Sequence, residues 1–196
     1  MTTDVPIFAL GTVLFPEGSL SLRVFEPRYV DMIRECMRQS QPFGVACIQT
    51  GSEMGKAPSI HPVATYARIV DFDRLDDGLL GITAIGEQRF QMGNTRVQSD
   101  QLLIAEAVTP LAADEVLEIP SELTHLCQIA KEIFKVSGQT LSPQQPLHAG
   151  WVANRIAEVL PLDSEVKQAF LELVDPMQRL QEVNTIVLEV AAQDQS

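Results

Sequence analysis

The sequence predicts an α+β protein whose first half forms a sheet and whose second half is helical. Along residues 20–24, apolar and polar side chains alternate, which is the period of a strand with one buried face. After residue 120, apolar side chains instead recur at the spacing of a helix, as Leu123, Leu126, Ile129, Ala130 and Ile133 show. The change of period falls in an acidic, non-periodic stretch at 111–120. We therefore expect two subdomains, 1–112 and 113–196.

The first subdomain is expected to begin with two strands and a helix. Residues 5–10 are mostly apolar and short enough for a buried strand, and 13–15 are expected to resume it before Pro16 ends the pairing. The alternating strand at 20–24 follows. Pro27 suits the first turn of a helix, because a helix needs no N–H there. The apolar face of that helix comprises Tyr29, Ile33, Cys36 and Met37.

Further strands are predicted to complete the sheet. An apolar run at 43–48, an extended stretch at 62–72, a return at 79–90 and a last segment at 102–108 all have strand length. Residues 50–59 contain glycine, serine and proline and are expected to form a loop, and the Asp-Gly pair at 77–78 predicts a hairpin turn. Gly81 and Gly86 suggest bends or bulges in the returning strand.

The second half is expected to contain four helices. Ser121 is the candidate N-cap of the first, and Gly138 its candidate end. A proline- and glutamine-containing loop at 141–146 leads to a second helix at 148–160. A third begins at Asp163 or Ser164 and runs to Val174, and the Asp-Pro pair at 175–176 resembles the start of a capped fourth helix.

Composition excludes several classes of function. The net charge of −12 would repel a phosphate backbone, so we expect no nucleic-acid partner. No apolar run is long enough to cross a bilayer, and the N-terminus lacks a basic region followed by an apolar block. We therefore expect no membrane partner and a cytoplasmic location. Cys36, Cys47 and Cys127 fit buried reduced thiols better than a disulfide framework.

One stretch resembles a known family. The order Pro-Ile-Phe-x-Leu from Pro6, Val-Leu-Phe-Pro-x-Gly from Val13 and Leu-x-Leu-Arg-x-Phe-Glu-Pro-Arg-Tyr ending at Tyr29 is similar to the start of the Lon protease amino-terminal domain. It is most similar to the stand-alone bacterial proteins that consist of that domain and lack the ATPase and protease domains. Residues 61–69 and 86–90 resemble the paired strands of the family, although His61-Pro62-Val63 replaces its commoner Val-Gly-Thr.

The resemblance extends through the helical half. Trp151, Asn154, Arg155, the Leu-Pro-Leu at 160–162 and the Arg-Leu at 179–180 stand in the order found in the family. It implies a PUA-like, mostly antiparallel β-barrel subdomain with one helix after the second main strand, followed by a C-terminal helical bundle. It also implies substrate recognition in proteolysis, through the binding of unfolded or specific protein segments.

No catalytic, cofactor or metal motif is recognisable. The chain has no GxxxxGK[ST] phosphate loop and no G-x-S-x-G nucleophile elbow, and its four lysines lie outside any nucleophile motif. The histidines His61, His125 and His148 are far apart in three different contexts, so surface or partly buried roles are favoured. We expect no enzyme activity, and a protease function would rest on the family name only.

An acidic cluster surrounds the predicted hairpin turn. It consists of Asp71, Asp73, Asp76 and Asp77. Carboxylate oxygens could form a weak cation site, but the spacing of a calcium loop is missing. A solvated turn that ends two strands is the favoured interpretation.

Five residues are candidates for binding. Arg28, with Glu26 and Tyr29, lies where the second strand meets the helix, and it could pair internally with a carboxylate. Alternatively this corner, together with Phe15, could line a groove for an extended polypeptide. Trp151 is expected near the junction of the subdomains, where a tryptophan is more often a core anchor than a binding residue.

The leading hypothesis is a non-catalytic module that binds polypeptide segments or another protein. Exposed strand edges and an apolar cleft are physical routes to such binding. An adaptor or oligomerisation domain that docks onto a folded partner is the alternative, and a hydrolase built from scattered residues is the least favoured. The oligomeric state does not follow from the sequence.

Overall fold

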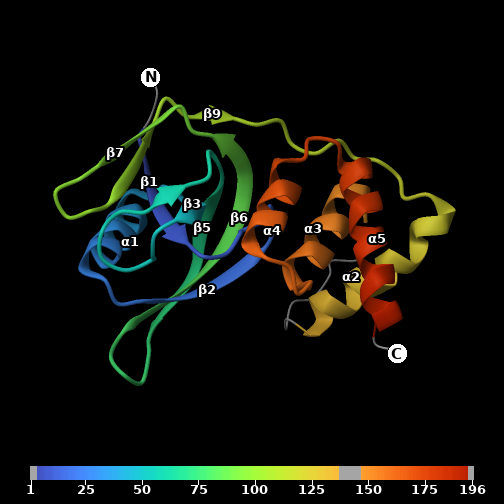
Figure 1. The fold of residues 1–196 in the computed structure, drawn as a ribbon. Helices are drawn as coiled ribbons and strands as arrows, with labels where there is room; N and C mark the ends of the chain where they lie inside the picture. Colours follow the sequence, from blue (N-terminus) through green and yellow to red (C-terminus); the bar gives the residue numbers. More distant parts are fainter. Residues whose placement is uncertain (1–3, 137–146, 194–196) are drawn as a thin grey trace. The chain divides into compact units, whose positions relative to one another are not determined.

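The computed structural model describes residues 4–136 and 147–193, in two compact units (Figure 1). The first unit, Met1–Ala113, contains the sheet, and the second, Asp114–Ser196, contains helices. The predicted α+β class is therefore confirmed. The expectations for Gly138 and for the loop at 141–146 lie outside the described residues.

The first unit contains one helix and a 9-stranded sheet within its described part. Its elements are β1 (Val5–Leu10), β2 (Ser19–Val24), α1 (Pro27–Gln39), β3 (Phe43–Thr50), β4 (Ser59–Ile60), β5 (Val63–Arg74), β6 (Leu80–Gln91), β7 (Asn94–Val97), β8 (Leu103–Glu106) and β9 (Thr109–Pro110). The hairpin tip between β5 and β6 projects away from the rest of this unit (Figure 1).

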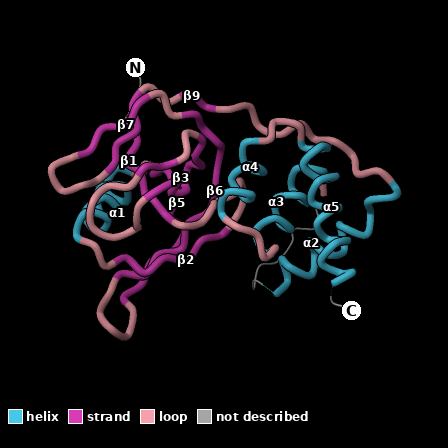
Figure 2. The backbone as a smooth tube through the Cα atoms, viewed as in Figure 1, coloured by secondary structure: helices cyan, strands magenta, loops and turns pink. Residues whose placement is uncertain are grey.

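The strands pair in the order β2-β6-β5-β3-β1-β8-β7, so β2 and β7 are the two end strands. Only the β1–β3 pair is parallel among the described strands. The short strand β9 follows β8 closely in the chain and pairs with β6, which also pairs with β5. Figure 2 shows these strands, and no pairing joins β8 to β9 among the described residues, so the sheet is open and the closed barrel that the resemblance implies stays a prediction.

Two apolar clusters hold this unit together. Helix α1 contributes Tyr29, Met32, Ile33 and Cys36 to a cluster that includes Phe8, Phe43 and Ile82 of the sheet. A second cluster is formed by side chains on the other face of the sheet, including Ile7 of β1, Ala46 of β3 and Phe90 of β6. Because successive side chains of a strand point to opposite faces, both faces of the central strands are buried.

Residues 13–15 do not continue the first strand, contrary to expectation. They are buried but irregular, and the Leu14 carbonyl accepts a 2.6 Å hydrogen bond from the Thr65 hydroxyl. The turn that follows is bonded to Gly86, whose N–H donates to the Gly18 carbonyl at 2.8 Å. A side-chain contact and a turn therefore replace strand pairing here, which the apolar composition of the segment did not reveal.

Only one of the two glycines in β6 lies beside a bulge. The register shifts between Thr65 and Ala67, opposite Gly86, and again between Ile69 and Asp71 on β5. At Gly81 the pairing with Asp73 is regular. The strands β4, β7 and β9, of two to four residues, were not predicted as separate elements.

The second unit contains a 3-10 turn and four α-helices in its described part. They are η1 (Ser121–Leu123), α2 (Thr124–Val136), α3 (Ala149–Val159), α4 (Ser164–Glu172) and α5 (Pro176–Gln193). Ser121 lies inside the 3-10 turn, whose N-cap is Pro120, so the predicted cap was displaced by one residue. No described helix combines the length and apolar character that a membrane span requires.

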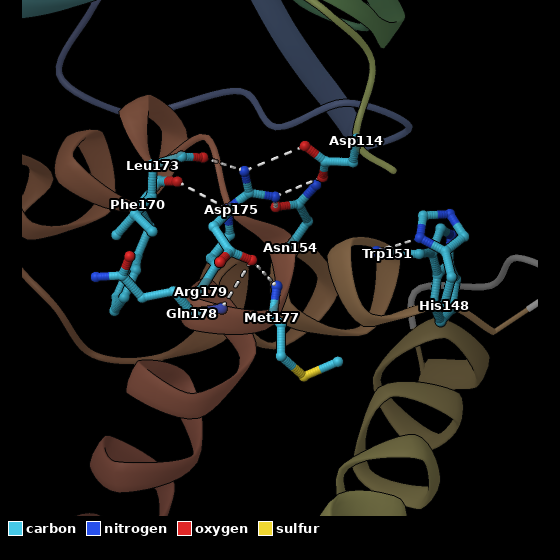
Figure 3. A network of polar contacts seen from close by, with 10 residues as sticks. All are labelled: Asp114, His148, Trp151, Asn154, Phe170, Leu173, Asp175, Met177, Gln178 and Arg179. Atoms are coloured by element: carbon cyan, nitrogen blue, oxygen red, sulfur yellow. Dashed lines mark hydrogen bonds and ion pairs between the residues drawn. The ribbon is translucent and has the colours of Figure 1, made fainter. Parts of the chain in front are cut away.

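Side-chain caps explain where two of these helices begin (Figure 3). The Asp175 carboxylate accepts hydrogen bonds from the N–H groups of Met177, at 2.8 Å, and Gln178, at 3.3 Å. At the start of α3, His148 Nδ1 accepts from the Trp151 N–H at 3.3 Å. Both caps satisfy donors that have no partner within the first turn.

A buried arginine joins the segments of the second unit (Figure 3). The guanidinium of Arg179, 1% exposed, donates to the Phe170 carbonyl at 2.9 Å, to Asn154 Oδ1 at 3.1 Å and to the Leu173 carbonyl. It also pairs with the carboxylate of Asp114 at 2.5 Å. The first residue of this unit is thereby tied to its last helix.

Candidate functional site

The corner between β2 and α1 brings three of the predicted binding residues together. Arg28 is 4% exposed and pairs with the Glu26 carboxylate at 3.0 Å. It also donates to backbone carbonyls of Glu53, Gly55 and Gln101 at 2.8–3.0 Å. The internal pairing considered from the sequence is therefore present, and Arg28 fixes two loops against the helix.

Tyr29 completes this corner. Its ring stacks on Phe8 at a centroid distance of 3.9 Å, and the guanidinium of Arg28 lies over the ring at 4.7 Å from its centroid. Burial raises the pKa of the Tyr29 hydroxyl, an effect that the charge of Arg28 partly offsets. Tyr29 therefore stays neutral and supports the packing of α1.

Phe15 and Trp151 are not part of this corner. Phe15 is fully buried in the first unit, and Trp151 is 2% exposed in the second, where its ring is 5.6 Å from that of Phe134. The histidines are also dispersed: His125 is bonded to Asn184 at 2.9 Å, and His148 caps α3. No group of three or more potential metal ligands occurs within residues 4–136 and 147–193.

The first unit has an open strand edge, which is a candidate binding feature. Strand β2 pairs with β6 on one side, and within the described residues no strand pairs with its other side. The other end strand, β7, is four residues long against six for β2. The sequence predicted β2 as a strand, but its position at the end of the sheet depends on the whole pairing order.

Hollows lie on both sides of β2 at its middle. A hollow of about 440 Å³ is lined by Ser21, Leu22 and Arg23 together with residues 71–73 and 81–83. A second, of about 190 Å³, is lined by the same three residues and by Phe8, Leu10, Tyr29 and Glu26 among others. Two of the predicted binding residues, Glu26 and Tyr29, therefore contribute to a hollow beside this edge.

Two exposed aromatic side chains stand next to these hollows. Phe25, directly after β2, is 54% exposed, and Phe72 on β5 is 59% exposed. Phe72 also lines a further hollow of about 310 Å³ between β5 and the end of α1. Sequence reasoning missed both residues, because an apolar residue within or beside a strand is ordinarily expected to be buried.

The largest of these hollows is less suited to binding. It measures about 480 Å³ beside α1 and is lined by four carboxylates over an apolar floor. Three of those carboxylates already have ion-pair partners: Asp4 with Arg96, Asp31 with Arg34, and Glu35 with Arg38. Its charge is therefore largely matched within the molecule.

Burial shifts the pKa values of two neighbouring residues in the second unit, Glu158 and Lys167. Burial raises the pKa of Glu158 to about 7, and the nearby charges of Arg155, at 2.7 Å, and Lys167 only partly offset it. Burial also lowers the pKa of Lys167, whose ammonium donates to the Glu158 carbonyl at 2.8 Å. Burial accounts for both shifts without a catalytic role.

From the raised pKa of Glu158 we expect the stability of the protein to depend on pH. Because folding raises the pKa of Glu158 from 4.5 to about 7, the folded state binds this proton more tightly. The stabilisation is complete below pH 4.5 and is lost as the pH rises through 7. Between pH 5 and pH 8, the Glu158 contribution to the free energy of unfolding should fall by ~1–2 kcal/mol, allowing for its partial exposure.

Urea unfolding at pH 5, 6, 7 and 8, followed by Trp151 fluorescence, measures this difference. The variant Glu158→Gln should lack this part of the pH dependence. Glu182→Gln, on the exposed side of α5, is the matched control and should keep it. Equal pH slopes for the wild type and Glu158→Gln would contradict the assignment.

One family of known sequences matches nearly the whole chain. Residues 4–189 match the family described as the ATP-dependent protease La (LON) substrate-binding domain. Curated relatives include Lon protease 2 of Myxococcus xanthus, 28% identical over 95% of this chain, and a Lon protease of Brevibacillus choshinensis, 27% identical over 94%. The chain spans only 23% and 24% of these two proteins.

Solved structures resemble the fold over a similar extent. A Lon N-terminal domain protein from Xanthomonas campestris is 32% identical, with a TM-score of 0.75, and the match covers 93% of this chain and 98% of that one. The N-terminal domain of a Mycobacterium avium complex Lon protease is 16% identical, with a TM-score of 0.64 over 94% of this chain and 97% of that one, and shows the fold alone.

Proposed function

Because this chain belongs to the family of ATP-dependent protease La (LON) substrate-binding domains, we propose that it is a non-catalytic module that binds extended polypeptide segments. The open edge of β2, with a hollow on either side of its middle residues, is the observation that carries this proposal. The segment would pair with β2 as an additional strand.

Strand addition fits the chemistry of this edge. An end strand presents backbone N–H and carbonyl groups that an extended peptide can pair with, whatever the peptide sequence. Alternate side chains of the added strand would then point to opposite faces of the sheet, toward one hollow or the other. This combination favours segments that are unfolded and only loosely defined in sequence.

The residues that the sequence singled out for binding would have different roles in the proposed site. Glu26 and Tyr29 line the smaller hollow, and Arg28 holds the corner from which α1 leaves β2. The buried side chains of Phe15 and Trp151 would act through packing. Phe25, directly after β2, supplies exposed apolar surface that the segment would contact.

The decisive experiment measures binding of backbone-methylated peptides to the full chain. One ten-residue peptide of alternating valine and serine is unmethylated, and a second carries an N-methyl group at every position. Strand addition needs the N–H groups of one edge, and full methylation removes those of both edges, so the methylated peptide should bind at least tenfold more weakly than the unmethylated one. Equal affinities would contradict strand addition, and retention of only a folded partner would indicate an adaptor.

A side-chain substitution locates the site. Phe25→Ala removes an exposed aromatic ring directly after β2, in the lining of the smaller hollow, and should weaken binding of the unmethylated peptide about tenfold, as expected of an aromatic contact. Val97→Ala, on the exposed end strand β7, is the matched control and should bind as the wild type does. Isothermal titration calorimetry gives both affinities. An equal loss of affinity in the two variants would show that the peptide does not bind at β2.

A further inference from the structure

We propose that the hollow between β2 and β5 is a specificity pocket for one long cationic side chain, arginine first, of the bound polypeptide. This inference rests on the proposed binding along β2. It concerns the 440 Å³ hollow lined by β2, β5 and β6, called here the β2–β5 pocket.

The pairing register fixes which side chains face this pocket. Ser21 of β2 pairs with Thr83 of β6, which pairs with Asp71 of β5. In the next row of the same face, Arg23 pairs with Gly81, and Gly81 with Asp73. Directly paired residues point to the same side of a sheet, so two carboxylates and two hydroxyls share the pocket.

Gly81 lies in the middle of the pocket floor, where the Leu75 side chain packs over its backbone. A Cβ placed at this position would lie 2.8 Å from Leu75 Cδ2, so the pocket floor here consists of backbone and the leucine methyl groups. Leu75 is also in the lining, whereas Phe72, between Asp71 and Asp73 on β5, points to the opposite face of the sheet. Apolar contacts of this kind suit the methylene stem of an arginine or lysine, while the charged end needs polar partners.

The two carboxylates of the pocket wall are available to a ligand. Asp71 and Asp73 accept hydrogen bonds from the backbone N–H groups of their neighbours, Phe72 at 2.9 Å and Arg74 at 2.7 Å. Within residues 4–136 and 147–193, neither carboxylate has an ion-pair partner. Arg23 is instead paired with Asp77 of the hairpin turn. The pocket therefore keeps an excess of negative charge, unlike the larger hollow beside α1.

The length of the side chain matters for this pocket. Neighbouring strands lie ~4.8 Å apart, so β6 is about two spacings, or ~10 Å, from a strand added to β2. The carboxylates are on β5, about three spacings or ~14 Å from the added strand, so only a long side chain that extends over β2 and β6 can approach them. Arginine combines that reach with a planar group of five donors.

Peptide binding to the full chain tests this selectivity. The probe is the alternating valine–serine peptide with one central serine replaced by arginine, citrulline, 2,3-diaminopropionate or glutamate. The arginine peptide should bind about 5- to 10-fold more tightly than the peptide with citrulline, the neutral isostere of arginine. It should exceed the peptide with the short cation diaminopropionate by a similar factor. Glutamate should bind most weakly, and the preference should shrink in 0.5 M salt because the carboxylates are exposed.

A protein variant assigns the preference to the pocket wall. Asp71→Asn/Asp73→Asn keeps the oxygens that accept the two backbone hydrogen bonds and removes both charges, so the fold should persist and arginine should bind no better than citrulline. Asp76→Asn, on the exposed hairpin turn outside the lining, should retain the preference. Equal affinities for arginine and citrulline in the wild type would overturn the pocket while leaving strand addition in place. Failure of every peptide to bind would overturn both.

Discussion

Replacing Arg179 by methionine is expected to lower the free energy of unfolding of the helical unit by ~3–5 kcal/mol. The guanidinium is 1% exposed, and its loss removes the ion pair with Asp114 and the hydrogen bonds to the carbonyls of Phe170 and Leu173. Removing one partner of a buried ion pair is costly, because the remaining charge is uncompensated. Arg179→Lys should rescue little, since one ammonium cannot reach acceptors on four sides of a planar group.

Trp151 provides the measurement, because it is the single tryptophan of the chain and is buried in this unit. Its fluorescence during urea unfolding should show the midpoint of the Arg179→Met variant shifted far below that of the wild type. The control is Arg96→Met, which removes an exposed arginine that also has two carboxylate partners, Asp4 and Glu106. That change should cost less than ~1 kcal/mol. Similar losses in the two variants would show that Arg179 acts as a surface charge.

Gly86→Ala is expected to destabilise the sheet unit by ~2–3 kcal/mol, the upper part of the typical range for overpacking, because the contact is with backbone. A Cβ at this position would lie 2.2 Å from the carbonyl oxygen of Phe15. The backbone of Gly86 also makes two hydrogen bonds to the turn. Its carbonyl accepts from the Glu17 N–H and its N–H donates to the Gly18 carbonyl, each at 2.8 Å. The chain cannot move apart here without breaking these bonds.

Gly81→Ala in the same strand is the matched control. Its added methyl group would lie 2.8 Å from Cδ2 and 3.1 Å from Cγ of the Leu75 side chain, which can rotate away, and at an ordinary 3.6 Å from the Asp73 carbonyl oxygen. Alanine is also the less flexible residue in a strand. The change should therefore cost less than ~1 kcal/mol. Differential scanning calorimetry gives the unfolding midpoints of both variants. A midpoint of Gly86→Ala close to that of Gly81→Ala would refute the steric argument.

The predictability of the candidate site depended on the residue. Glu26 and Tyr29 were selected from the sequence because they lie where a strand meets a helix, and both line the hollow beside β2. Phe72 and Gly81 were not selected, because neither a lone aromatic residue nor a glycine in a strand indicates a pocket. Asp71 and Asp73 were seen as an acidic cluster, but the sequence could not show that they lack ion-pair partners.

The sequence by itself determined the classes of element and most of their limits. Alternation predicted β2, the proline at position 27 predicted the start of α1, and the Asp-Pro pair at 175–176 predicted the start of α5. These features are local, because a strand period, a helix cap and a hairpin turn each involve only neighbouring residues.

Only the tertiary structure decided which strand ends the sheet and which buried polar groups meet. The edge of β2 is open because of the order in which seven strands pair, and Arg179 meets Asp114 across 65 positions in the chain. Such contacts depend on how distant segments pack together, and the local sequence carries no signal for that packing. The proposed site arises in the same way, since its walls come from β2, β5 and β6, which only the pairing register brings together.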